Sequence, residues 1–479
     1  MSSEEEKTQR VEIESQSEKL LSQGTQVVPR KPILVKKNQE NESTPHLRLR
    51  AAMSRATIEL VRTPGFEDSA STGVIYVMSR ATMLGWGYKN REWCNFGQGA
   101  PEVGQIPNSV PRPTSASWNP QGNEYASVAG TKKLRQAVAD LYNVRYRVGL
   151  KSQYTYENVC ITPGGRASLT RLASTFGQVY LGHFLPDYSA YEEMLSVFKK
   201  FVPIPEMLDP LLDYKERIAN LHREIVAKGL SLVLLSNPSN PTGNVIEETE
   251  LDEWVQLARD THTCFIMDEF YSNYIYSHPV EQNGRTVSAA SYVHDVNSDP
   301  IVIVNGLTKN WRLPGWRITW TIGPKDVIRN VANAGSFLDG GANHPFQEAA
   351  IPLLDPKFVH EDTKCLQDHF RKKRDYVASE LINMGIDIPK ISKGTFYLWA
   401  DVRNLPPPLN MGLGFFEEAL KFKVVVVPGI FFDVNPAKRR NLFHSPYHHN
   451  VRISYGPPME ELALGLKNLR EMIHKYTKK

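Results

Sequence analysis

Three short apolar runs, each followed at once by polar residues, constrain the fold of this chain more than any other feature. The runs cover residues 231–235, 264–267 and 301–304, and none of them alternates apolar and polar side chains. Such runs are typical of strands that are buried on both faces of a sheet. Between the first two, residues 247–261 space apolar side chains three and four positions apart, as on one face of a helix. The strand–helix–strand order predicts an α/β fold built on a parallel sheet.

The polar residues after these strands predict a ligand site. Open parallel sheets bind ligands beyond the carboxyl ends of their strands. Asn240, Asp268 and Lys309 follow the three runs in that order, and Tyr271 and Arg317 come shortly after two of them. We therefore expect these five side chains to meet at one edge of the sheet.

The chemistry of the five residues predicts pyridoxal 5'-phosphate as the ligand. A carboxylate such as Asp268 keeps a neighbouring pyridine nitrogen protonated, which makes the ring a better electron sink. Lys309 can form a Schiff base with the aldehyde and later move a proton. Asn240 and Tyr271 can donate hydrogen bonds to the phenolate oxygen, and the planar guanidinium of Arg317 suits the phosphate.

Taken singly, each of these residues has an ordinary structural explanation. The segment Asn237–Gly243 has the composition of a turn. An Asp at the end of a strand is more often a helix cap than a cofactor ligand, and a lone Lys or Arg is usually a solvated charge. The prediction rests on their joint order and on the eight positions between Lys309 and Arg317.

These motifs resemble those of the class I/II aminotransferases, the fold type I pyridoxal-phosphate enzymes related to aspartate aminotransferase, from about Asn95 to the C-terminus. The resemblance implies a large domain with a mostly parallel seven-stranded sheet flanked by helices, and a smaller α+β domain. It assigns catalytic roles to Lys309, Asp268 and Tyr271. It also implies that the phosphate cup lies at Gly164, Gly165 and Arg166, at the start of a helix, where free backbone N–H groups attract phosphate.

Other positions are carried over one by one from the same resemblance. Tyr188 is expected to stack on the cofactor ring, whereas Tyr191 is expected in the core. Arg452 matches the arginine that binds the substrate α-carboxylate. Gly99 lies in the segment that closes over the substrate, and Asn240 is also expected to contact the substrate. Tyr125 matches the tyrosine that reaches the phosphate of the neighbouring subunit, which implies a homodimer.

Two segments depart from the family pattern. Gly306 stands where many relatives carry a serine, so that Thr308 is the candidate for the missing phosphate hydroxyl. Residues 339–345, including Asn343 and His344, replace a Ser/Thr-rich stretch that crosses to the partner's phosphate, and whether they make that contact is left open. We find no convincing second arginine for a side-chain carboxylate; Arg166 is a candidate, but the phosphate region is the better assignment.

The expected reaction moves an amino group from an L-amino acid to a 2-oxo acid, through a Schiff base on Lys309 and a pyridoxamine phosphate intermediate, in amino-acid metabolism or biosynthesis. A pyridoxal-phosphate-dependent lyase, eliminating or cyclising an amino acid, is the alternative, because the pocket decides which bond breaks. A partner-binding protein of the same fold is a third reading. The sequence does not name the amino donor.

Bulk properties exclude several other classes. The 479 residues carry 56 Lys and Arg against 52 Asp and Glu, and no basic stripe predicts nucleic-acid binding. No apolar run reaches the ~20 residues of a membrane helix, and the acidic N-terminus resembles no targeting signal, so the cytoplasm is expected. Four scattered cysteines fit a reducing compartment. The histidines near position 448 lack metal-ligand spacing, and no metal site is predicted.

The chain is too long for one domain. Residues 1–50 contain no Phe, Trp or Tyr, and we expect a disordered or extended arm. A helix over 51–62 opens a segment (51–113) that contributes to the small domain and the dimer contact. The large cofactor-binding domain is expected over 114–343. A long helix then leads into a small domain over 344–479, with strands at 395–399, 423–427 and 451–455 and a closing helix over 460–475.

Overall fold

The computed structural model describes residues 73–477 of the chain. All of these belong to one compact unit, which begins at Thr63. The predicted arm (1–50) and the predicted helix over 51–62 lie outside the described residues.

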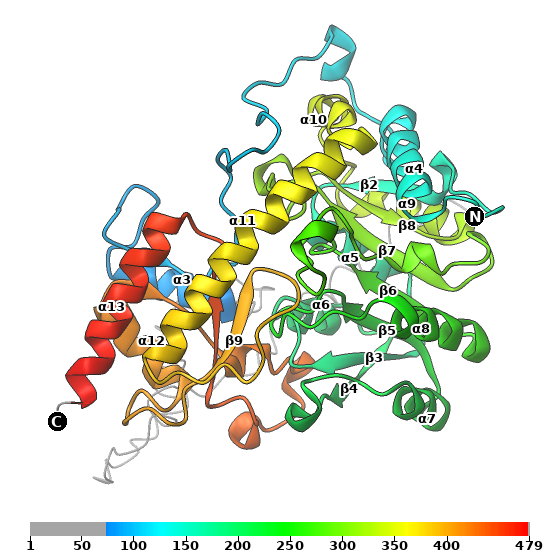
Figure 1. The fold of residues 1–479 in the computed structure, drawn as a ribbon. Coiled ribbons are helices and arrows are strands. Elements are labelled where there is room, and N and C mark those ends of the chain that lie inside the picture. Colours follow the sequence, from blue (N-terminus) through cyan, green and yellow to red (C-terminus); the bar gives the residue numbers. More distant parts are fainter. Residues whose placement is uncertain (1–72, 478–479) are drawn as a thin grey trace, which may run out of the picture. The chain divides into compact units, whose positions relative to one another are not determined.

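A seven-stranded sheet forms the centre of the fold (Figure 1). Its strand order is β2-β8-β7-β6-β5-β3-β4, and β8 alone runs antiparallel to its neighbours β2 and β7. The strands are β2 (Val159–Thr162), β3 (Tyr180–Leu185), β4 (Val202–Met207), β5 (Leu230–Ser236), β6 (Cys264–Asp268), β7 (Ile301–Gly306) and β8 (Thr319–Ile322). This confirms the predicted α/β fold class with a mostly parallel sheet.

Both faces of this sheet are buried, which explains why its central strands read as unbroken apolar runs. Ile266 of β6 packs into one hydrophobic cluster, whereas its neighbours Phe265 and Met267 pack into another. In β7, Val302 and Val304 face the first cluster. The helices that belong to this part are α4 (Lys132–Tyr146), α5 (Gly165–Thr175), α6 (Tyr191–Val197), α7 (Ile218–Lys228), α8 (Glu248–Thr261), α9 (Lys325–Leu338) and α10 (His344–Ala350).

The long helix α11 (Pro356–Asn383) links this part to the C-terminal strands (Figure 1). Asp355 caps its start, because its carboxylate accepts hydrogen bonds from the backbone N–H groups of Lys357 and Phe358. Along its length α11 contacts both α4 and β9 (Tyr397–Asp401). The helix therefore spans the two groups of strands.

Two small sheets complete the described part. One has the order β11-β12-β9 and contains β11 (Val427–Pro428) and β12 (Asn450–Ser454); the other pairs β1 (Cys94–Asn95) with β10 (Val424–Val425). Around them lie α3 (Gly73–Met83), α12 (Gly412–Lys421) and α13 (Met459–Thr477). The predicted single strand over 423–427 is wrong, because it is divided between these two sheets. The predicted domain boundaries at 113 and 343 stay a prediction.

Candidate active site

A cavity of about 480 Å³ lies at the carboxyl ends of β5, β6 and β7. Ser236 and Asp268 end β5 and β6, and Lys309 follows β7. The cavity wall contains most of the predicted site residues: Gly99, Gly165, Arg166, Tyr188, Asn240, Asp268, Tyr271, Thr308, Lys309, Arg317 and Arg452. The sheet thus brings these predicted residues together beyond the carboxyl ends of its parallel strands, where ligands bind in open parallel sheets.

Lys309 is held at the middle of the cavity. Its Nζ donates a hydrogen bond of 2.6 Å to the carbonyl oxygen of Gly99. Burial lowers the pKa of Lys309 to about 7, and the positive charges of Arg452 and Arg317 act in the same direction. A large fraction of this amine is therefore neutral near pH 7, which is the nucleophilic form.

Asp268 is a buried carboxylate, 5 % exposed. The hydroxyl of Tyr191 donates a hydrogen bond of 2.7 Å to its Oδ2, and the backbone N–H of Phe270 lies 3.4 Å from its Oδ1. Burial raises the pKa of Asp268 to about 6, and the two hydrogen bonds and Lys309 oppose that rise. Tyr191 is buried, as expected, but its bond to Asp268 was not predicted.

Tyr271 is connected to the cavity through a second tyrosine. Its hydroxyl lies 2.8 Å from that of Tyr397, which in turn donates to the carbonyl oxygen of Gly99 at 3.2 Å. Tyr397 lies in β9, far away in sequence, and was not predicted as a site residue. Tyr397 and Lys309 thus both donate to the Gly99 carbonyl, and Tyr271 is joined to them through Tyr397.

The end of the cavity near Gly164 and Arg317 suits a phosphate group. Gly164 begins α5 with φ +105, and a Cβ at this position would collide with the guanidinium of Arg317. The backbone at the start of α5 has no side-chain cap, so its N–H groups remain for a ligand. Thr308 Oγ1 is buried and has no hydrogen-bond partner among the described residues. A phosphate at this position would accept hydrogen bonds from the guanidinium of Arg317, the backbone N–H groups of α5 and the hydroxyl of Thr308.

The missing serine at position 306 has a steric explanation. A Cβ on Gly306 would lie 2.5 Å from the Cα of Thr319 on the neighbouring strand β8. Because the obstacle is backbone, a serine does not fit here. Thr308 is the hydroxyl that the structure leaves at this end of the cavity.

Arg452 is buried, 1 % exposed, at the end of the cavity nearest the small sheets. Its Nη1 donates to Asn240 Oδ1 at 2.9 Å and its Nη2 donates to the carbonyl oxygen of Gly97 at 2.6 Å. The guanidinium also stacks 4.2 Å from the ring centre of Tyr397. Its Nε has no partner in the described structure. A substrate carboxylate is the natural acceptor for such a group.

Tyr125 is the predicted site residue that a single chain does not bring to the cavity. Its side chain is 98 % exposed, and it is absent from the cavity wall described here. The ring of His344 lies beside it, because His344 Nδ1 is 2.9 Å from the carbonyl oxygen of Glu124. Asn343 caps α10 at the same place. Tyr125, which is expected to reach the partner, therefore lies close to the segment whose contact with the partner was left open.

One side of the cavity consists of apolar residues that the sequence analysis did not find. Val74, Ile75 and Met78 come from α3, and Trp86 and Tyr88 follow that helix. Their only sequence signal is the spacing of apolar side chains along residues 73–83, which is equally typical of a core helix. Trp93, Trp311 and Phe396, by contrast, are buried in the core.

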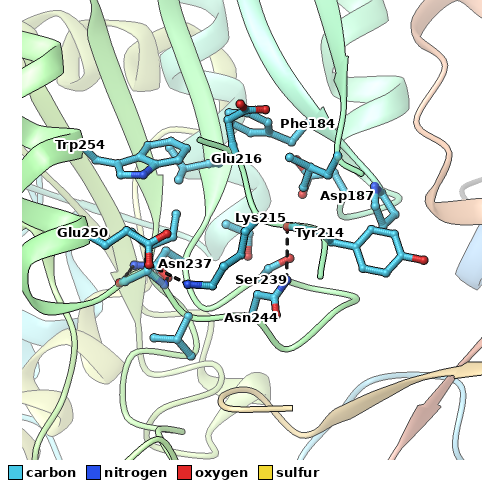
Figure 2. Close-up of a pocket in the computed structure, with 16 residues that line it drawn as sticks. Phe184, Asp187, Tyr214, Lys215, Glu216, Asn237, Ser239, Asn244, Glu250 and Trp254 are labelled. Atoms are coloured by element: carbon cyan, nitrogen blue, oxygen red, sulfur yellow. Dashed lines mark hydrogen bonds and ion pairs between the residues drawn. The ribbon is translucent and has the colours of Figure 1, made fainter. Parts of the chain in front are cut away.

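A second, smaller cavity of about 50 Å³ lies on the other side of the Asn237–Asn244 turn (Figure 2). In Figure 2, Lys215 extends to Glu250, to which it forms an ion pair of 2.7 Å. This cavity contains none of the predicted site residues. In the described part of the chain, no group of three or more His, Cys, Asp or Glu side chains is placed to hold a metal ion, and no helix there is long and apolar enough to cross a membrane.

Comparison with known proteins decides the family. Residues 91–469 match the sequence profile of "Aminotransferase class I and II". The chain belongs to this family. It is 26 % identical over 359 residues to a probable N-acetyl-LL-diaminopimelate aminotransferase of Bacillus subtilis. The alignment covers 73 % of this chain and 82 % of the relative. It is 24 % identical over 427 residues to an aspartate aminotransferase of Sulfolobus acidocaldarius, covering 85 % and 98 %.

The fold has the same relatives. A structure of Thermus thermophilus aspartate aminotransferase with maleate superimposes with a TM-score of 0.67, at 21 % identity, over 84 % of this chain and 97 % of that one. Family members use pyridoxal 5'-phosphate, and the protein is a pyridoxal-phosphate-dependent aminotransferase. The relatives give no support to the lyase alternative.

Proposed function

We propose that Lys309 carries the cofactor and moves the proton during transamination between an L-amino acid and a 2-oxo acid. The single observation that supports this best is the position of its amine, bonded to Gly99 in a cavity that also contains Asp268, Arg317 and Arg452. When bound, pyridoxal 5'-phosphate supplies the electron sink for the α-carbon. A base with a pKa of about 7 matches its task near neutral pH.

The other residues bind and orient. Arg317, Thr308 and the N-terminus of α5, with Gly164, Gly165 and Arg166, hold the phosphate. Asp268 keeps the proton on the pyridine nitrogen. Tyr271 and Asn240 donate to the phenolate oxygen, and Tyr188 lies against the ring. Arg452 binds the α-carboxylate of the substrate, in place of its present bond to the Gly97 carbonyl, and the Gly99 segment excludes water.

Mass mapping tests the role of Lys309. The protein is loaded with pyridoxal 5'-phosphate, reduced with borohydride and digested, and we expect the cofactor mass on the peptide that contains Lys309. Lys309→Ala should lose it, whereas Lys325→Ala, at an exposed lysine that pairs with Glu157, should keep it. Attachment to another lysine would contradict the proposal.

A single-turnover reaction separates transamination from elimination. With an amino donor alone, transamination leaves the amino group on the cofactor and releases one equivalent of 2-oxo acid per site, without ammonia. An eliminating lyase would release ammonia and continue to turn over. Sustained ammonia production without an added 2-oxo acid would therefore overturn the proposed reaction.

The same proposal includes a cytoplasmic homodimer in which Tyr125 of one chain reaches the phosphate of the other. The exposure of Tyr125, next to Asn343 and His344, supports it. Sedimentation should give a dimer. A mixed dimer can combine one chain that carries Tyr125→Phe with one that carries Lys309→Ala. In this arrangement both defects fall in one site, and the other site stays intact. Full activity of a monomer would exclude this arrangement.

A further inference from the structure

The charges around the active-site cavity limit which amino acids it can accept. Among the described residues of the wall, the positively charged groups are Arg166, Lys309, Arg317 and Arg452, and the negatively charged group is Asp268. In the proposed function, Arg317 and Arg166 serve the phosphate end and Arg452 the α-carboxylate. Among these wall residues of one chain, no cation is then left to bind the second carboxylate that an acidic donor would bring into the cavity.

The remaining side of the cavity is apolar. Val74 and Met78 lie one turn apart on α3, with Ile75 beside them, while Val77 and Ala81 of the same helix are buried in the core. The only charged side chain on this helix, Arg80, pairs with Glu417 at 3.0 Å. We call the residues on the cavity side, including the two aromatic residues described next, the apolar wall: Val74, Ile75, Met78, Trp86 and Tyr88.

The aromatic part of the apolar wall lies at the surface, where Tyr88 is 85 % exposed. The rings of Trp86 and Tyr88 pack edge to face with centroids 4.9 Å apart. Gln98 donates a hydrogen bond of 3.3 Å to the Tyr88 hydroxyl. Gln98 belongs to the same short segment as Gly97 and Gly99. The apolar wall is thereby attached to the segment that contacts Arg452 and Lys309.

That segment places the apolar wall next to the substrate. The Gly97 carbonyl accepts from Arg452 and the Gly99 carbonyl accepts from Lys309. An amino acid held by its α-carboxylate at Arg452, with its nitrogen near Lys309, therefore lies beside this segment. Its side chain extends into the part of the cavity that the apolar wall lines.

We propose that the preferred amino donor has a large, uncharged, apolar side chain, of the kind found in leucine, methionine or phenylalanine. The proposal rests on the proposed function, since it takes Arg452 as the carboxylate site. Burial of an apolar side chain against such a wall favours it over both a short and a charged one.

The test is a panel of amino donors in the single-turnover reaction of the pyridoxal-phosphate-loaded enzyme. We expect kcat/KM for leucine, methionine or phenylalanine to exceed that for alanine by about tenfold or more, as hydrophobic pockets discriminate by roughly 10- to 200-fold per methylene. Aspartate and glutamate should be slower by at least a similar factor. Equal or faster reaction of aspartate or glutamate would overturn the proposal and assign Arg166 to the side-chain carboxylate. If no donor reacted, the proposed function itself would fail, which is a different result.

A variant pair examines the apolar wall directly. Met78→Arg adds a cation at the wall and should raise the ratio of glutamate to methionine kcat/KM at least tenfold. The matched control is Met83→Arg on the same helix, at a side chain that is 78 % exposed and outside the cavity wall, and it should leave the ratio unchanged. Should Met78→Arg fail to fold, Met78→Ala replaces it, and the rate with methionine should fall more than the rate with alanine. Equal effects of position 78 on both donors would refute the assignment.

Discussion

The bond from Tyr191 to Asp268 gives the sharpest prediction about the site. Tyr191→Phe removes one hydroxyl from a fully buried carboxylate and changes little else. A hydrogen bond to a charged group contributes about 1.5–3 kcal/mol. Since one pH unit corresponds to about 1.36 kcal/mol, its loss should raise the pKa of Asp268 by about one to two pH units above its present value of about 6.

A higher pKa of Asp268 should weaken cofactor binding at low pH. In the proposed function the pyridinium nitrogen needs an ionised Asp268, and in the variant this carboxyl stays protonated up to a higher pH. We expect the affinity for pyridoxal 5'-phosphate to fall about 5- to 50-fold at pH 6 and to approach the wild-type value by pH 9, where Asp268 is ionised in both proteins. The assay is titration of the cofactor into the apoprotein, followed by absorbance or fluorescence, between pH 5.5 and 9.

Tyr447→Phe is the matched control. Tyr447 is equally buried, but its hydroxyl has no hydrogen-bond partner among the described residues, and it lies outside the cavity wall. Its replacement should leave cofactor affinity unchanged at every pH. A loss of affinity in Tyr191→Phe that does not depend on pH would indicate a packing defect, and an unchanged affinity would show that the bond does not tune Asp268; either result refutes the reasoning.

Three further predictions concern stability and the phosphate end. Lys309→Met should stabilise the apoprotein by several kcal/mol at pH 6, because folding lowers the pKa of this amine to about 7. This gain in stability, measured by thermal unfolding, should shrink as the pH rises toward 10.5. Asp339→Asn should cost about 3–5 kcal/mol in urea unfolding, because it leaves the fully buried guanidinium of Arg171 without its charged partner. Gly164→Ala should weaken cofactor binding by about tenfold or more, since the added Cβ displaces Arg317 and one lost charged contact is worth about 1.5–3 kcal/mol.

Each of these has a control elsewhere in the chain. Lys467→Met changes an exposed lysine and should show no such pH dependence. Glu157→Gln breaks the exposed pair with Lys325 and should leave urea unfolding nearly unchanged. Gly177→Ala meets no atom within 4 Å and should leave cofactor binding intact. Equal effects of a variant and its control would contradict the corresponding prediction.

Sequence patterns predicted the central strands because burial on both faces leaves an unmistakable run of apolar residues. The run over 231–235 became β5 (Leu230–Ser236), and that over 264–267 became β6. The strand β4 (Val202–Met207) escaped notice because it contains Pro203 and Pro205. It lies at the edge of the sheet, paired only with β3, where a proline costs no bond to a further strand.

From the residues alone, the candidate site was predictable only where it follows a strand end, whereas Gly99, Tyr188 and Arg452 were carried over from the family resemblance. Asp268 and Lys309 are brought together by the sheet, whose edge is fixed by the order of strands and helices. Tyr191, Tyr397 and the apolar wall reach the cavity by packing between segments that are far apart in the chain. No local periodicity encodes such a contact, so a buried tyrosine that bonds Asp268 looks the same in sequence as one that only fills the core.

The charges of the cavity also suggest an order of events in the proposed function. Arg452, Arg317 and Arg166 all lower the pKa of Lys309, in addition to burial. A phosphate beside Arg317 and a carboxylate beside Arg452 would each offset one of these positive charges and so raise the pKa of the amine. Lys309 is thus least basic in the empty cavity. It becomes more basic once both anions are in place, when it must accept the α-proton. The arginines that bind the anions therefore also set the basicity of Lys309.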